Sequence, residues 1–121
     1  MIQIQNIKKE FGEQTIFNDA SLLIASQERV GIVGKNGSGK STLIKTMCDL
    51  MRPMSGKVLL NGTDIHDIDV TDFAKLVSYV PQSMDAGVYT AVIDTVLLGR
   101  KPYVTWTYRE KDIRYALDAM R

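Results

Sequence analysis

A glycine-rich run in the first half of the chain has the residue types and spacing of a phosphate-binding loop. It matches the pattern G-x-x-x-x-G-K-[ST] followed by threonine, with the residues Gly34, Lys35, Asn36, Gly37, Ser38, Gly39, Lys40, Ser41 and Thr42. In such a loop the three glycines allow backbone angles that turn successive N–H groups inward, where they bind a polyphosphate. Lys40 would then reach the β- and γ-phosphates, and the Ser41 hydroxyl would bind Mg²⁺. The alternative is a chance glycine-rich turn.

The segments on either side are those that a phosphate loop requires. Residues 29–33 are nearly all apolar in their interior, which indicates a strand buried on both faces, as in a parallel sheet. Apolar residues then recur at helical spacing and predict a helix that begins near Lys40 and ends at Pro53. A strand, a loop and a helix N-terminus in this order place backbone N–H groups and a helix dipole at an anion.

The remaining elements follow from local patterns. Alternating apolar and polar residues predict strands at the N-terminus, with a turn at residues 11–13. A capping-box pattern, Thr107 to Glu110, predicts the start of the last helix. The other predicted elements are strands at 57–60 and 77–80 and helices at 71–76 and 92–98, the last ending at Gly99.

Two features narrow the class of phosphate-loop protein. Strand-rich sequence precedes the loop, and a predicted strand after it closes with Tyr79-Val80-Pro81-Gln82. The chain resembles the ATP-binding cassette (ABC) family over essentially its whole length. The resemblance rests on these two features, on the glycine-rich loop and on the segments Phe11-Gly12, 53–56 and 60–62. The resemblance implies an α/β fold of the P-loop NTPase, ABC type, with an antiparallel β region (about 1–28), a core with the P-loop, the Q-loop and an incomplete parallel sheet (about 29–100), and the start of a helical subdomain (about 101–121).

The resemblance also implies roles for single residues, with ATP and Mg²⁺ as the cofactors. Gln82 is similar to the Q-loop glutamine, which contacts Mg²⁺ or the attacking water and connects the site to a membrane subunit. Lys40 and Gln82 are therefore the expected catalytic residues, and Ser41 and Gln82 the expected metal ligands. Phe11 falls where the family places an aromatic that stacks on adenine, usually a tyrosine, and such stacking contributes about 1–3 kcal/mol. The alternatives are a core aromatic for Phe11 and a plain loop residue for Gln82.

A further resemblance concerns the transported solute. Residues 96–103 are similar to the segment after the Q-loop in importers of iron–siderophore complexes, haem and cobalamin. This likeness implies a subunit on the cytoplasmic face of the cell membrane. Its partners would be membrane permease subunits, a second ATP-binding subunit that shares two sandwiched ATP molecules, and, indirectly, a substrate-binding protein.

Several parts of an ABC ATPase site do not occur in these 121 residues. There is no Leu-Ser-Gly-Gly signature, and Ala91 to Asp94 is followed by Thr95 rather than by a water-activating Glu. His66 precedes the Q-loop, which is the wrong place for the switch histidine. We therefore expect the N-terminal half of an ABC ATPase that does not complete hydrolysis alone. The alternatives are a non-catalytic nucleotide-binding or regulatory module and a small-molecule P-loop kinase.

The composition limits the remaining classes. A net charge of +1 argues against a nucleic-acid partner, and 45% hydrophobic residues argue against a disordered chain. The single cysteine, Cys48, excludes a disulfide framework and is expected to be a small buried hydrophobe. His66 lies among aspartates, but a lone histidine in a polar loop is expected to be solvated rather than to bind a metal. No signal peptide or membrane-spanning stretch is predicted.

Overall fold

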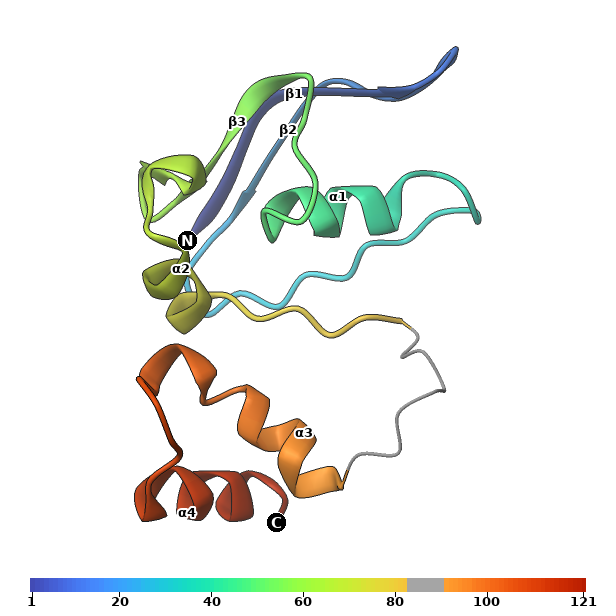
Figure 1. The fold of residues 1–121 in the computed structure, drawn as a ribbon. Helices are drawn as coiled ribbons and strands as arrows, with labels where there is room; N and C mark the ends of the chain where they lie inside the picture. Colours follow the sequence, from blue (N-terminus) through green and yellow to red (C-terminus); the bar gives the residue numbers. More distant parts are fainter. Residues whose placement is uncertain (83–90) are drawn as a thin grey trace. The chain divides into compact units, whose positions relative to one another are not determined.

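The computed structural model describes residues 1–82 and 91–121 (Figure 1). These residues form two compact units, Met1–Asp69 and Val70–Arg121. The first unit contains the phosphate loop, and the second contains Gln82 and the helices near the C-terminus. Each unit is described by itself.

The first unit is built on a four-stranded sheet with the order β2-β1-β3-β4. Its strands are β1 (Ile2–Phe11), β2 (Gln14–Ile24), β3 (Ser55–Leu60) and β4 (Thr63–Asp64), and every pair is antiparallel. The predicted N-terminal strands and the turn between them are therefore confirmed. Register shifts between β1 and β2 on either side of Ile7 mark bulges, and bulges increase the local twist.

The core of this unit lies on one face of the sheet. Ile4 and Ile7 of β1 are 2% and 0% exposed, and Val58 of β3, the register partner of Ile4, is 1% exposed. Helix α1 (Lys40–Met47) lies along this sheet, and its Met47 is also buried (Figure 1). Burial of these apolar side chains holds the helix that follows the phosphate loop onto the β region.

Helix α1 ends six residues before the predicted stop at Pro53. Asp49 adopts a left-handed conformation with φ 55°, its N–H donates to the Thr46 carbonyl, and the Leu50 N–H donates to the Lys45 carbonyl. This pair of bonds is the Schellman arrangement, which closes a helix at its C-terminus. The predicted boundary was wrong because the local closure ends the helix before the proline is reached.

Two predicted strands have no partner within the described part of the chain. Residues 29–33 and 77–80 are not paired with any strand there, and the side chains of Val33 and Val80 are 96% and 84% exposed. A strand is defined by hydrogen bonds to a neighbouring strand, so the apolar pattern alone does not produce one. Within the described residues, the strands therefore form the antiparallel sheet β2-β1-β3-β4 and no parallel sheet.

The second unit is helical. It contains α2 (Val70–Leu76), α3 (Val92–Leu98), the 3₁₀ helix η2 (Lys101–Tyr103) and α4 (Glu110–Ala119). Leu97 of α3 and Ala116 of α4 are buried where these two helices pack. The predicted helix at 92–98 is confirmed. No helix in either described stretch is both long enough and apolar enough to cross a bilayer.

A buried ion pair joins α4 to Arg100, which lies between α3 and η2. The Asp112 carboxylate accepts the Arg109 backbone N–H at 3.0 Å and the Arg100 Nε at 3.0 Å, and its side chain is 2% exposed. Helix α4 therefore begins at Glu110, three residues after the predicted cap at Thr107, because Asp112 takes the capping role. The backbone N–H of Arg109 is the main cause of the lowered pKa of Asp112, opposed by burial and assisted by Arg100.

We predict that Asp112 makes the stability of the second unit depend on pH. Its pKa is lower in the folded chain than the unfolded value of about 3.9, so the stabilisation is complete above that value and is lost as pH falls through the folded pKa. Hydrogen exchange of the α4 amides, corrected for intrinsic rates, should show protection that weakens over this acid range. Asp112→Asn should show weaker protection already at neutral pH.

The matched control is Asp118→Asn on the same helix, whose carboxylate is 58% exposed and pairs with Arg121 at 3.5 Å. It should change α4 protection little, because exposed ion pairs contribute little to stability. Equal effects of the two substitutions would contradict the assignment.

Candidate functional site

The phosphate loop connects an extended segment to the N-terminus of α1. Its residues 34–38 are exposed, and Gly39 caps the helix with φ 93°. The Leu43 N–H donates to the Gly39 carbonyl at 2.8 Å, which begins the helical bonding pattern. The N–H groups of the first helical turn have no intrahelical acceptor, and no acidic residue lies in that turn. This end of α1 therefore favours an anion.

At Gly39 the loop lies close to the sheet. A Cβ atom at this position would lie 2.5 Å from Ile16 Cγ2 and 3.2 Å from Phe17 Cζ, both on β2. Only glycine therefore fits here, both for its positive φ and for the space. The sequence indicated the glycine, but not the two β2 residues against which it packs.

The side chain of Lys40 closes the loop. Its Nζ donates to the Gly34 carbonyl at 2.6 Å and to the Lys35 carbonyl at 2.8 Å. An ammonium group has three N–H donors, so these two bonds leave a third direction for an acceptor such as a phosphate oxygen. At the other end of the loop, a Cβ at Gly34 would lie 2.7 Å from Ser38 Oγ, so a larger residue there would displace the Ser38 side chain.

Two predicted ligands lie on the first turn of α1. Ser41 is exposed at this turn, and Thr42 follows it. The Thr42 carbonyl accepts the Thr46 hydroxyl at 2.8 Å, and Thr46 is buried. The Thr46 hydroxyl therefore stabilises the turn that carries Ser41. The Ser41 side chain itself remains exposed. A hydroxyl in this position can bind a hard cation such as Mg²⁺.

Phe11 ends β1 with its ring accessible. The residue is 47% exposed, which does not fit the alternative of a core aromatic. Lys9, two residues earlier on β1, is the register partner of Phe17, which packs at Gly39. The same short piece of hairpin thus supports the end of the phosphate loop and carries the exposed ring.

Gln82 belongs to the other unit. It is exposed and follows Pro81, which is exposed as well. The predicted core of residues 29–100 includes 83–90, which lie outside the described residues. The role expected for Gln82 stays a prediction.

His66 is exposed, as predicted, and its ring also lies near two aspartates. Its Nε2 lies 3.4 Å from Asp49 Oδ1, and its Nδ1 lies 3.2 Å from Asp64 Oδ1. The His66 backbone N–H donates to Asp64 and is the main cause of the lowered pKa of that carboxyl. Among residues 1–82 and 91–121, no group of three or more His, Cys, Asp or Glu residues could hold a metal ion.

Two other residues singled out from the sequence have structural places. Cys48 is half-buried at the C-terminal end of α1, and burial raises the pKa of its thiol. Asp94 lies in the first turn of α3, as the helical spacing around it predicted, and not at the end of a strand.

Comparison with known proteins places the chain in one family. The family model described as ABC transporter matches residues 17–118. An uncharacterized ABC transporter ATP-binding protein of Methanocaldococcus jannaschii is 36% identical over 113 residues, which cover 93% of this chain and 44% of that protein. The hemin import ATP-binding protein HmuV of Methylobacillus flagellatus is 30% identical, with 100% of this chain and 45% of that protein covered.

Other relatives import different solutes. The petrobactin import ATP-binding protein YclP of Bacillus subtilis is 30% identical, with 100% of this chain and 49% of that protein covered. The methionine import ATP-binding protein MetN of Chlamydia felis is 34% identical, with 97% and 36% covered. The chain thus spans about half the length, or less, of the curated relatives it matches.

The fold is that of a solved ABC cassette. A dimeric ATP-binding cassette in a post-hydrolysis state, bound to ADP and Pi, matches with a TM-score of 0.80 and 25% identity over 99% of this chain and 56% of that one. The predicted fold class, an α/β P-loop NTPase of ABC type, is confirmed by this match.

We predict that Gly39→Ala weakens polyphosphate binding by at least about tenfold. The added methyl group would meet Ile16 Cγ2 at 2.5 Å, and the left-handed backbone disfavours alanine by roughly 1–2 kcal/mol, so the loop must move. Titration calorimetry with magnesium tripolyphosphate measures the affinity. Gly31→Ala is the control, because a Cβ there meets nothing within 4 Å, and it should bind as the wild type does. Unchanged affinity in Gly39→Ala would show that the close approach is not required.

Proposed function

We propose, from the premise that this chain belongs to the ABC transporter family, that residues 34–42 bind the phosphates of ATP with Mg²⁺ and that the whole protein couples ATP binding and hydrolysis to solute uptake. One observation carries the proposal. The phosphate loop is closed by Lys40 on the carbonyls of Gly34 and Lys35, directly ahead of a helix N-terminus. This arrangement presents an ammonium and several N–H groups to the same anion.

The proposed roles follow from the chemistry of each group. The Lys40 ammonium stabilises negative charge on the β- and γ-phosphates, and the Ser41 hydroxyl is a ligand of Mg²⁺. Gln82 is a second ligand of the metal or orients the attacking water. The Phe11 ring stacks on the adenine, which its exposure supports. Mg²⁺, held by Ser41 and Gln82, would neutralise negative charge on the phosphates.

The solute proposed is an iron complex, such as a siderophore or haem, or cobalamin. The segment 96–103 supports this choice, as do the relatives named for hemin and petrobactin import. A relative named for methionine import has similar identity, so the family alone does not select the solute.

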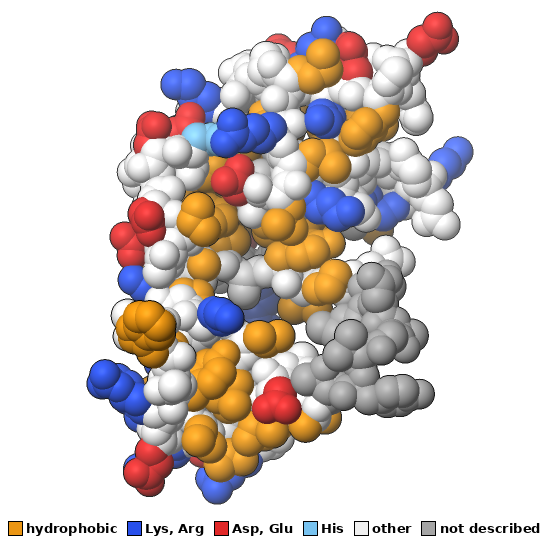
Figure 2. Space-filling view, in the orientation of Figure 1, with side chains coloured by type: hydrophobic (Ala, Val, Ile, Leu, Met, Phe, Trp, Pro, Cys, Tyr) orange, Lys and Arg blue, Asp and Glu red, His pale blue; other side chains and the backbone are white. Residues whose placement is uncertain are grey.

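The partners proposed are membrane permease subunits, a second ATP-binding subunit and, through the permease, a substrate-binding protein. The protein would act on the cytoplasmic face of the membrane. Exposed apolar side chains in Val70–Arg121 support a partner there, including Leu98 at 60%, Tyr115 at 59% and Trp106 at 96% exposed. Figure 2 shows hydrophobic side chains on the visible surface of the part that Figure 1 assigns to α3 and α4. The matched cassette, itself dimeric, supports the second subunit.

We expect residues 1–121 to bind ATP but not to hydrolyse it at a steady rate, because they contain no signature and no water-activating Glu. Lys40→Ala should weaken Mg²⁺ATP binding by at least about tenfold, since a charge-assisted hydrogen bond contributes roughly 1.5–3 kcal/mol. Titration calorimetry gives the affinities, and a phosphate-release assay gives the rates.

Lys45→Ala, in the last turn of α1, removes the same charge away from the loop and should bind ATP normally. Equal affinity in wild type and Lys40→Ala would overturn the proposed site. Steady phosphate release by this chain that Lys40→Ala abolishes would overturn the expectation about hydrolysis.

A further inference from the structure

The exposed ring of Phe11 has a cation on one of its faces. Lys9 Nζ lies 5.2 Å from the centroid of the ring. Residues two apart on a strand point to the same side of a sheet, so Lys9 and Phe11 leave β1 together. At this distance an ammonium is attracted to the electron-rich face of an aromatic ring. One face of Phe11 is thereby occupied, although the residue is 47% exposed.

The ammonium of Lys9 is itself held in place. Its Nζ donates to the Arg52 carbonyl at 2.9 Å, in the segment between α1 and β3. That segment is tied to the same strand by the Met54 N–H, which donates to the Lys8 carbonyl at 2.8 Å. Lys9 therefore connects the Phe11 ring to the chain that leaves the helix of the phosphate loop.

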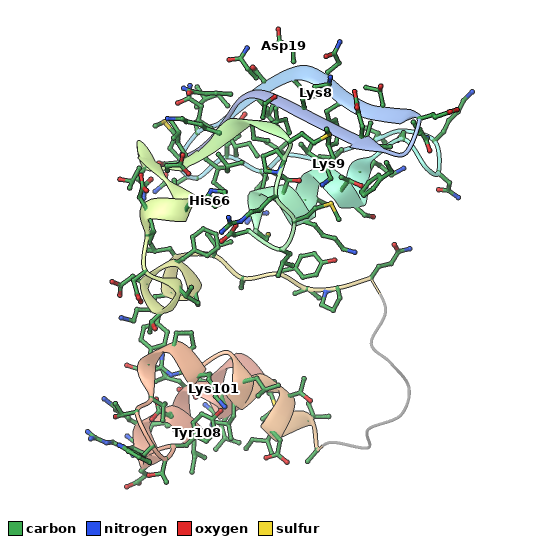
Figure 3. The ribbon with its side chains drawn as sticks, turned by 45° about the horizontal axis from the view of Figure 1, so that its top comes forward. Lys8, Lys9, Asp19, His66, Lys101 and Tyr108 are labelled. Atoms are coloured by element: carbon green, nitrogen blue, oxygen red, sulfur yellow. The ribbon has the colours of Figure 1, made fainter. Side chains whose placement is uncertain are left out.

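The neighbouring lysine has a different environment. Lys8 points to the opposite side of β1 and pairs with Glu10 at 3.0 Å, with 42% of its side chain exposed (Figure 3). The two lysines are adjacent and carry the same charge, but the described ring contact belongs to Lys9. Lys8 is therefore a matched control for any effect of charge on nucleotide binding.

We propose that Lys9 is a positioning residue for the nucleotide base: it covers one face of Phe11 and holds the ring so that an aromatic base stacks on the other face. The inference rests on the proposed function, which gives Phe11 its base. A cation on one face draws electron density toward itself, which makes the opposite face a better partner for an electron-rich purine. A ring held before the base arrives also loses less freedom on binding.

The test is a double-mutant cycle on the full chain, with two ligands. Titration calorimetry with Mg²⁺ATP and with magnesium tripolyphosphate, which has no base, is carried out on Lys9→Met, Phe11→Leu and the double variant. We expect Lys9→Met to weaken ATP binding about two- to fivefold, the range of a cation–π contact, and to leave tripolyphosphate binding unchanged. Lys9→Met should have no further effect in the Phe11→Leu background. Lys9→Arg should restore ATP affinity, and Lys8→Met should match the wild type.

Three results would overturn the inference while leaving the phosphate site intact. The first is an unchanged ATP affinity in Lys9→Met. The second is an equal loss of affinity for ATP and for tripolyphosphate in Lys9→Met. The third is the same loss of ATP affinity when Lys9→Met is added to Phe11→Leu. An equal loss would mean that Lys9 only supports the fold through Arg52. A wild-type chain that binds neither ligand would instead overturn the proposed function, and this inference with it.

Discussion

The close approach at Gly39 is the contact on which the rest of the first unit depends. The end of the phosphate loop touches Ile16 and Phe17 of β2 with no room for a side chain between them. Because α1 begins at the next residue, this contact fixes where the positive end of the helix dipole lies relative to the sheet. The buried side chains Ile4, Ile7 and Met47 supply the stability, and the glycine contact sets the position.

The same contact joins the two ends of the proposed nucleotide site. Phe17 is the register partner of Lys9, and Lys9 lies two residues from the Phe11 ring. The Lys9 ammonium then returns to the segment that follows α1, at the Arg52 carbonyl. The hairpin and the loop therefore support each other. Both belong to the same compact unit, Met1–Asp69. A shift of the hairpin would move the ring and the phosphate loop together.

The sequence predicted the parts of this fold that depend on local signals. The hairpin turn after Phe11, the start of α1 at Lys40 and the end of α3 at Gly99 are each marked by residues within a few positions. Two helix boundaries were missed, the end of α1 at the closure around Asp49 and the start of α4. Helix α4 begins at Glu110 because Asp112 caps the Arg109 N–H, and the burial of Asp112 depends on Arg100, twelve residues earlier, whose guanidinium lies over the rings of Tyr103 and Tyr115 at 4.4 and 4.7 Å. No window of neighbouring residues contains that information.

In the candidate site, too, some residues could be predicted from the sequence and others could not. The residues of the proposed phosphate loop were predicted from type and spacing, because a tight anion-binding turn needs glycines and a lysine at fixed intervals. The supports of the loop were not, because Ile16 and Phe17 are ordinary apolar strand residues whose role depends on the register of the hairpin. Lys9 was also missed, since its charge suggests solvent and only the fold brings it to Phe11 and Arg52. Spacing therefore predicts the groups proposed to contact a ligand, whereas the contacts between strands and loops identify the groups that hold them in place.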